Sequence, residues 1–178
     1  MVKVSLLAIG NEVVDGQIIN RNCAWLAEEL NKLGFSVLFH MSCCDEAESI
    51  EQCLNFLKLY SNLIITTGGL GPTSDDCTRS CLSDFLECPL EFNKDLWKQI
   101  EMHLSRRQVQ IRDAHQQQAY IPKGCEALPN SKGTAPGFWF HKDLFSLAAL
   151  PGPPVELQAI WNEHLKDKLL QSLKPEKD

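Results

Sequence analysis

The sequence predicts an α/β protein in which a mostly parallel sheet carries helices on both faces. Three observations support this prediction. Short runs of almost unbroken apolar residues, typical of strands buried on both faces, recur along the chain. Segments with apolar residues at helical spacing separate these runs, and a strand–helix–strand order requires parallel crossovers. Loops that contain glycine follow three of the predicted strands, which is where ligands bind in parallel sheets.

The first half of the chain alternates regularly between the two kinds of segment. Arg21–Leu33 shows the helical pattern, with its apolar residues on one face and Gly34 as a stop signal. The expected strands are Val2–Ile9, Phe35–His40 and Asn62–Thr67, and the expected helices are Arg21–Leu33, Glu46–Tyr60 and Asp75–Leu86.

The second half is less regular. It is expected to contain a long helix (Asn93–Arg107), a shorter helix (Arg112–Tyr120), a hairpin within Cys125–Leu147, a strand (Leu144–Leu150) and a last helix after Pro151–Pro154. Proline fits the first turn of a helix because its missing N–H is not needed there. No linker interrupts the pattern, so residues 1–173 are expected to form one domain and residues 174–178 a charged tail.

Composition argues against several classes of protein. A formal net charge of −6 over 178 residues disfavours general nucleic-acid binding, which needs a basic face. No apolar run approaches the ~20 residues that span a bilayer. The first residues run directly into patterned sequence, so we interpret them as a strand and not as a signal peptide. We therefore expect a cytoplasmic protein without nucleic-acid or membrane partners.

The chain has eight cysteines but no CxxC pair. Zinc sites usually show closely spaced pairs of ligands. We expect reduced and mostly inert thiols that pack as small apolar side chains.

The glycine-bearing loops are expected to meet at one edge of the sheet. The most informative loop contains Gly68, Gly69, Gly71, Pro72 and Thr73. Backbone N–H groups of such a loop can bind phosphate next to a helix N-terminus, although a tight turn has the same composition. The spacing is that of neither a Walker A loop nor a GxGxxG loop. The other candidate ligand-binding residues of these loops are Gly10, Asn20, Gly133, Thr134, Pro136, Gly137, Pro151, Gly152 and Pro153.

Carboxylates stand beside two of these loops. Asp75 and Asp76 follow the central loop, where they could cap the next helix or hold a hard divalent cation that bridges phosphates. Glu12 follows the first strand, where a carboxylate could be functional or simply exposed. Asn20 precedes the first helix and is also a candidate for its N-cap.

Other residues have simpler interpretations. The polar stretch formed by His115 and Gln116–Gln118 is expected on a solvated helix face. Arginines are expected on the surface, and two strand aromatics in the core; these residues are Arg106, Arg107, Arg112, Trp139 and Phe140.

Five strings of residues, in this order, resemble one known family: IGNEVVDGQIINRN, TTGGLGPTSDDCT, IPKG, GTAPGF and LPGPPVEL. They are similar to the N-terminal domain of the competence/damage-inducible protein CinA. That domain is related to the molybdopterin-binding domain of molybdenum-cofactor biosynthesis proteins. The resemblance covers about residues 1–173. It implies a three-layer α/β/α sandwich of the molybdopterin-binding type.

The resemblance also implies an activity, the metal-dependent hydrolysis of ADP-ribose or a similar compound to AMP and a sugar phosphate. The divalent ion would be Mg, Mn or Co. The implied ligand-binding residues include the glycine loop, with Thr73 and Thr78, together with Gly133, Thr134 and Gly152. The implied catalytic residues are Asp75, Asp76 and Glu12, of which the two aspartates would also bind the metal.

Two departures from the family bear on that activity. Full-length relatives carry a C-terminal domain with nicotinamide-mononucleotide deamidase activity, which these 178 residues do not include, so deamidation is not expected. His115 and Gln117 stand where the family usually has asparagine and a basic residue, which would weaken phosphate contact. The alternatives are a molybdopterin-binding or molybdopterin-adenylylating protein and a non-catalytic nucleotide-binding module. A homodimer or homotrimer is expected.

Overall fold

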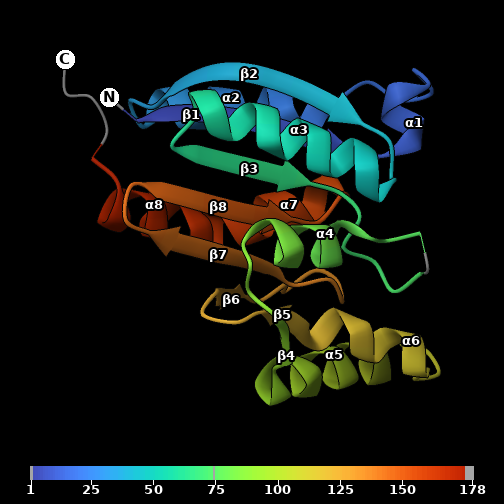
Figure 1. The fold of residues 1–178 in the computed structure, drawn as a ribbon. Helices are drawn as coiled ribbons and strands as arrows, with labels where there is room; N and C mark the ends of the chain where they lie inside the picture. The colour runs from blue at the N-terminus through green and yellow to red at the C-terminus, as the bar shows by residue number, and fades with distance from the viewer. Residues whose placement is uncertain (1, 74, 175–178) are drawn as a thin grey trace.

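The computed structural model describes residues 2–73 and 75–174. A six-stranded sheet runs through the molecule in the order β2-β1-β3-β8-β7-β6 (Figure 1). Its strands are β1 (Lys3–Ile9), β2 (Ser36–Cys43), β3 (Leu63–Thr67), β6 (Glu126–Leu128), β7 (Gly137–Lys142) and β8 (Phe145–Leu150). The neighbours β2, β1, β3 and β8 are parallel, whereas β7 and β6 pair antiparallel. The predicted mostly parallel sheet is confirmed.

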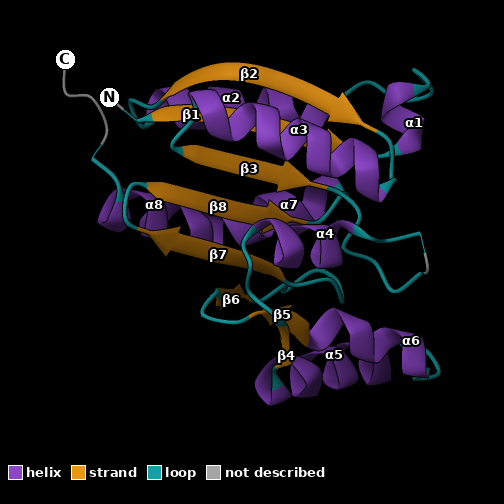
Figure 2. Cartoon of the chain, viewed as in Figure 1, coloured by secondary structure: helices purple, strands orange, loops and turns teal. Residues whose placement is uncertain are grey.

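Helices cover both faces of this sheet (Figure 2). They are α2 (Arg21–Lys32), α3 (Ala47–Tyr60), α4 (Thr78–Phe85), α7 (Pro154–Ile160) and α8 (Lys166–Ser172), with a π-helical turn, η2 (Trp161–Leu165), between the last two. The short helix α1 (Asn11–Val14) stands at the end of the sheet, beyond β2 (Figure 2). Side chains of β1 alternate between the two faces, as the strand period requires. Val4 and Leu6 pack in one core with α2, α7 and α8, and Leu7 and Ile9 pack in the other with α3 and α4. The three-layer α/β/α fold is confirmed.

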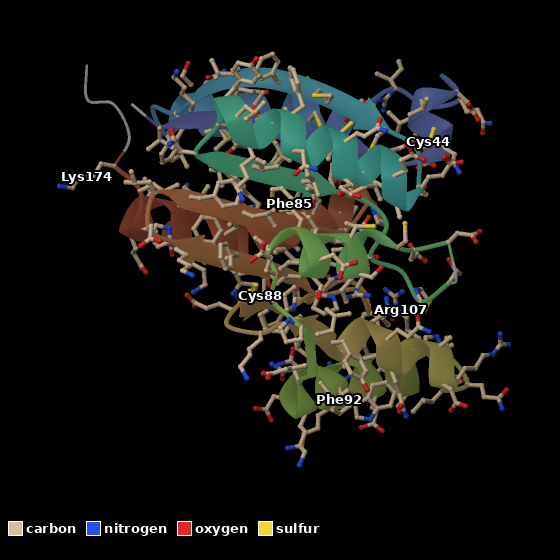
Figure 3. The ribbon with its side chains drawn as sticks, viewed as in Figure 1. Cys44, Phe85, Cys88, Phe92, Arg107 and Lys174 are labelled. Carbon is tan, nitrogen blue, oxygen red and sulfur yellow. The ribbon has the colours of Figure 1, made fainter. Side chains whose placement is uncertain are left out.

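A smaller lobe adjoins β6 at one edge of the sheet (Figure 1). It consists of β4 (Leu90–Phe92), α5 (Lys94–Arg106), α6 (Asp113–Gln116), a 3-10 turn η1 (Gln117–Ala119) and β5 (Tyr120–Pro122). Leu96, Ile100 and Leu104 of α5 are buried in the same core as α3 and α4. Phe92 lies on the lobe, with its ring centroid 5.2 Å from that of Tyr120 (Figure 3). The lobe is thus packed onto the sandwich through α5.

The structure corrects three predicted elements. The helix expected from Asp75 begins at Thr78, because the preceding residues remain in the glycine loop. The helix expected over Arg112–Tyr120 ends earlier and leads into strand β5. The two strands β4 and β5, three residues each, were not predicted; they pair only with each other, across almost thirty residues of chain.

The structure also tests the predictions made for single residues. Arg106, Arg107 and Arg112 are exposed and Trp139 is buried, as predicted. The expectation for Gln118 is wrong, because its side chain is only 1% exposed. A helix of one turn cannot show from its sequence which of its residues faces the body of the protein.

The cysteines and the chain end add little to the site. All eight cysteines are free, and burial raises the pKa of Cys81 and of Cys125 to about 12, which disfavours the reactive thiolate. Of the predicted charged tail, Lys174 is exposed and residues 175–178 lie outside the described residues. Within the two described ranges, no helix combines the length and apolarity needed to cross a membrane.

Candidate functional site

A cavity of about 640 Å³ lies at the carboxyl ends of the parallel strands. Its walls come from the ends of β1, β3 and β8 and from the loops that follow them. Its lining includes Glu12, Asn20, Asn22, Asp45, Gly68, Gly69, Gly71, Asp76, Gln118, Thr134, Gly152 and Glu156. The expectation that the strand-end loops meet at one edge is confirmed.

The glycine loop leaves β3 in a conformation that only glycine tolerates. Gly68 has φ +106°, and its N–H donates to the Leu150 carbonyl at 3.0 Å. A Cβ on Gly68 would stand 2.1 Å from the Ile9 carbonyl oxygen. Gly69 has φ +65°, and a Cβ there would lie 2.0 Å from Thr78 Oγ1. Close packing of β1, β3 and α4 therefore requires both glycines.

The Asp76 carboxylate closes this loop. The Gly71 N–H donates to Asp76 Oδ1 and the Thr73 N–H to Asp76 Oδ2, both at 2.9 Å, and the Thr73 hydroxyl donates to the same Oδ2. The capping role considered for Asp76 is therefore wrong: α4 begins at Thr78, and no side chain caps it. Instead, one carboxylate accepts the donors that a phosphate would need.

Asp45 is a second carboxylate of the cavity, which the sequence reasoning missed. It lies two residues after the end of β2 and exchanges two hydrogen bonds with Asn11. The Asn11 N–H donates to Asp45 Oδ2 at 3.3 Å, and the Asp45 N–H donates to Asn11 Oδ1 at 3.2 Å. Burial is the largest cause of the raised pKa of the Asp45 carboxyl, and the hydrogen bond from Asn11 opposes this effect by lowering the pKa. The negative charges of Glu12, Asp76 and Asp75 raise the pKa further. Its position at the end of a parallel strand was the available signal.

Asn22 connects the loops on the opposite wall of the cavity through hydrogen bonds. Its amide donates to Thr67 Oγ1 at 3.0 Å and to the Gly152 carbonyl at 2.7 Å. The Thr67 hydroxyl donates in turn to the Pro151 carbonyl at 3.0 Å. Asn20 caps α2 as expected, because its side chain accepts from the Cys23 N–H at 3.1 Å. These bonds fix the two loops that end β3 and β8 relative to α2.

Glu156, at the start of α7, is another carboxylate of the cavity that the sequence reasoning missed. It accepts from the Asn130 amide at 2.7 Å, and the Gly133 N–H donates to Asn130 Oδ1 at 2.9 Å. A Cβ on Gly133 would lie 2.4 Å from either Glu156 carboxylate oxygen. Gly133 therefore makes room for this carboxylate and does not itself line the cavity.

The predicted site residues divide into two groups. Those that line the cavity are Glu12, Asn20, Gly68, Gly69, Gly71, Pro72, Asp76, Thr134, Pro151, Gly152 and Pro153. Those that are not part of its lining are Gly10, Thr73, Asp75, Thr78, Gly133, Pro136 and Gly137. Gly137 belongs to β7, where a Cβ would lie 2.4 Å from the Ala149 carbonyl oxygen, so its role is in packing the sheet. Asp75 is exposed.

The carboxylates of the cavity are the type of ligand that hard divalent cations bind. Oxygen ligands are those that Mg²⁺ and Mn²⁺ prefer, and Mg²⁺ is often held by one or two carboxylates together with substrate phosphates. Among the residues that the structure describes, no three histidine, cysteine, aspartate or glutamate side chains are grouped to hold a metal. A cation at Asp45 or Asp76 would therefore need ligand oxygens to complete its shell.

One arginine of the lobe contacts the rim of the sandwich. Arg107, at the boundary between the lobe and the sheet domain (Figure 3), donates to the Lys132 carbonyl at 3.0 Å. Cys44 lies just after the end of β2, near α1 (Figure 3).

Comparison with known proteins adds the following. The family model described as "Probable molybdopterin binding domain" matches residues 5–171. A protein of Caldicellulosiruptor bescii named as competence-damage inducible is 37% identical over 160 residues, which are 90% of this chain and 39% of that protein. A protein of the same name from Clostridium botulinum is 38% identical over 159 residues, again 39% of its length. The chain thus spans about two fifths of these relatives.

Solved structures agree. The protein CinA from Thermoplasma acidophilum superimposes with a TM-score of 0.84 at 27% identity, covering 93% of this chain and 96% of that one. The molybdopterin biosynthesis enzyme MoaB from Thermus thermophilus has a TM-score of 0.62 at 19% identity, covering 99% and 100%, and so shares the fold. The expected similarity to CinA is confirmed.

Proposed function

The chain belongs to the molybdopterin-binding domain family, and from that premise we propose that its cavity binds a phosphorylated pterin or nucleotide together with a divalent cation. The observation that carries this proposal is the meeting of a glycine loop with carboxylates at the carboxyl edge of the sheet. The backbone of the loop lines the cavity and binds the Asp76 carboxylate through two N–H groups, which is the type of contact that an anion needs, and the carboxylates supply oxygen ligands for a cation.

The charge of the chain is consistent with this division of work. A protein with a formal net charge of −6 does not attract an anionic ligand by its overall field. Local donors must hold the phosphate, and a cation must separate it from Asp45, Asp76 and Glu12. Asp45 supports this idea, since repulsion by its acidic neighbours contributes to its raised pKa. A bound cation would relieve that repulsion.

Hydrolysis of a diphosphate such as ADP-ribose is a second candidate, favoured by the number of carboxylates at the glycine loop. Asp45 Oδ1 lies 3.2 Å from a Cβ built on Gly69, and Asp76 Oδ2 lies 2.5 Å from one built on Gly71, so both reach the same loop. The metal would supply charge neutralisation of the diphosphate. A carboxylate such as Glu12 would orient water, whose oxygen bonds to one phosphorus while the bridging P–O bond breaks and a proton leaves to solvent.

The oligomeric state and the cellular location of this chain are also proposals. The names of the relatives state that they are competence-damage inducible, and this chain covers only part of their length. We therefore propose for this chain only those activities of the relatives that its own cavity could perform. A cytoplasmic homodimer or homotrimer stays a prediction, to be checked by light scattering and by fractionation.

The test is a ligand panel with the intact chain. Phosphorylated pterins, AMP, ADP and ADP-ribose are titrated calorimetrically with and without Mg²⁺, Mn²⁺ or Co²⁺, and products are read by mass spectrometry. Binding of a phosphorylated ligand that strengthens with metal supports the proposal. Release of AMP from ADP-ribose supports the second candidate, and binding without products supports a non-catalytic module. A panel in which every compound fails to bind contradicts the proposal.

A further inference from the structure

Two buried polar side chains converge on one backbone oxygen behind the glycine loop. Arg79 Nη2 donates to the Leu70 carbonyl at 3.0 Å, and Gln118 Nε2 donates to the same oxygen at 3.4 Å. Arg79 is only 5% exposed and Gln118 only 1%. They come from separate parts of the chain, the first turn of α4 and the turn η1 of the lobe.

Burying these two polar side chains lowers the stability of the fold. Burial lowers the pKa of Arg79 to about 10, although the charge of Asp76 opposes that effect, so the guanidinium stays protonated at neutral pH. Among the described residues, Arg79 Nε and Gln118 Oε1 have no hydrogen-bond partner. Buried polar atoms without partners destabilise a protein by about 1–3 kcal/mol each. A structural role would be met more cheaply by apolar side chains.

The geometry of the peptide bond shows what the two side chains control. In a trans peptide, the carbonyl of one residue and the N–H of the next point in opposite directions. The Leu70 carbonyl points at Arg79 and Gln118, so the Gly71 N–H points away from them. There it donates to the Asp76 carboxylate at 2.9 Å, and Gly71 lines the cavity. Fixing the Leu70 oxygen therefore fixes the direction of the N–H group that holds the Asp76 carboxylate at the cavity.

We propose that Arg79 and Gln118 are positioning residues that hold the Gly71 N–H on the Asp76 carboxylate, and so keep this carboxylate and the glycine loop in place for a phosphorylated ligand and its cation. Both act through the Leu70–Gly71 peptide; Arg79 lies outside the cavity lining, whereas Gln118 is part of it. Arg79 also places a positive charge behind a loop whose neighbours are acidic. This inference rests on the proposed function. It assigns a role to the lobe, which contributes Gln118 to the sheet domain's glycine loop.

The inference is tested with Arg79→Met, Arg79→Lys, Gln118→Leu and the Arg79→Met/Gln118→Leu double variant. Arg112→Met, which removes an exposed arginine outside the cavity lining, is the matched control. Affinity for ADP is measured calorimetrically at one fixed Mg²⁺ concentration, and affinity for adenosine by competition. Melting of each free variant, followed by circular dichroism, reports any effect on folding separately.

Arg79→Met and Gln118→Leu should each weaken ADP binding by about tenfold or more, the loss expected for a misdirected charge-assisted hydrogen bond. Adenosine affinity should change by less than about twofold, because adenosine carries no anionic group. The losses in the double variant should not add, since both side chains act on one peptide. Arg79→Lys, which keeps the charge, should recover part of the affinity, and Arg112→Met should match the wild type.

The results that would contradict the inference can be told apart from those that would contradict the proposed function. If both variants melt lower but bind ADP as the wild type does, or if ADP and adenosine weaken equally, the two residues only support the structure and the inference is wrong. If the wild type itself does not bind ADP, the proposed nucleotide function fails first and this inference fails with it.

Discussion

The two ends of the parallel sheet differ in their chemistry. At the carboxyl ends of β1, β3 and β8, the cavity of about 640 Å³ is lined by glycines and carboxylates. At the amino ends of β3 and β8, a second cavity of about 460 Å³ has no glycine in its lining. There Lys58 Nζ lies 5.0 Å from the ring centroid of Phe85 and 5.6 Å from that of Phe145.

The difference shows how the fold separates binding from packing. At the carboxyl end, the loop after β3 leaves the sheet through the positive-φ residues Gly68 and Gly69, which brings its backbone to the cavity wall. At the amino end, a lysine over aromatic rings covers apolar surface with its own stem. We therefore expect substitutions at the carboxyl end to change ligand binding, and substitutions at the amino end to change stability slightly.

The largest effect should come from Gly68→Ala. The new methyl group would lie 2.1 Å from the Ile9 carbonyl oxygen, at φ +106°, so β1 and β3 must separate. The free energy of unfolding, measured by urea denaturation, should fall by about 3 kcal/mol or more. The control is Gly124→Ala at φ +80°, where a methyl group meets nothing within 4 Å; it should cost only the strain of about 1–2 kcal/mol. Equal losses would show that close packing at Gly68 is unimportant.

Asp76→Asn should leave the chain folded and remove most ligand binding. An amide keeps one acceptor oxygen, but its NH₂ group opposes the N–H donors of Gly71 and Thr73, so the loop loses its clamp and the cation loses a ligand. Affinity for ADP with Mg²⁺ should fall by about tenfold or more. Asp143→Asn, in the lining of the second cavity, should bind ADP as the wild type does. Wild-type affinity in Asp76→Asn would contradict the site.

Asp45→Asn should stabilise the free protein while it weakens the response to metal. Because burial and like charges raise the folded-state pKa of Asp45 above its unfolded value, ionisation costs stability as the pH rises through that pKa. The variant should therefore melt higher near neutral pH, by about 2 °C, and equal the wild type near about pH 3, where Asp45 is protonated in both states. Thermal melts across this range check the sign. A variant that is less stable at neutral pH would be inconsistent with a repelled carboxylate.

Lys58→Met should have the smallest effect. It removes a cation from two aromatic rings at the amino end, a contact worth about 0.5–1 kcal/mol when exposed. ADP affinity should be unchanged, since Lys58 lies away from the glycine loop. Loss of binding in this variant would mean that the second cavity, and not the first, takes the ligand.

The predictable part of the molecule is the part dominated by local pattern. Leu63–Thr67 is apolar or β-branched throughout because both of its faces are buried, so the sequence indicates a central strand. The glycine loop was equally visible, since positive φ at Gly68 and Gly69 requires glycine.

What could not be predicted depends on contacts between distant residues. Strand β4 exists because Leu90 pairs with Pro122, and three residues carry no periodicity of their own. Asp45 has no glycine beside it, so only the order of strands in the sheet brings it to the cavity. Gln118 was expected in solvent, yet the lobe folds back and buries it against the glycine loop.

Hydrogen exchange with ADP and Mg²⁺ tests most directly which end of the sheet binds. Amide exchange is followed by mass spectrometry in peptides that cover residues 67–73 and 151–157 at the carboxyl end, and residues 58–62 and 140–146 at the amino end. Binding at the glycine loop predicts slower exchange in the first pair and no change in the second. Protection confined to the amino end, or to neither end despite measured binding, would contradict the assignment of the ligand to the glycine loop.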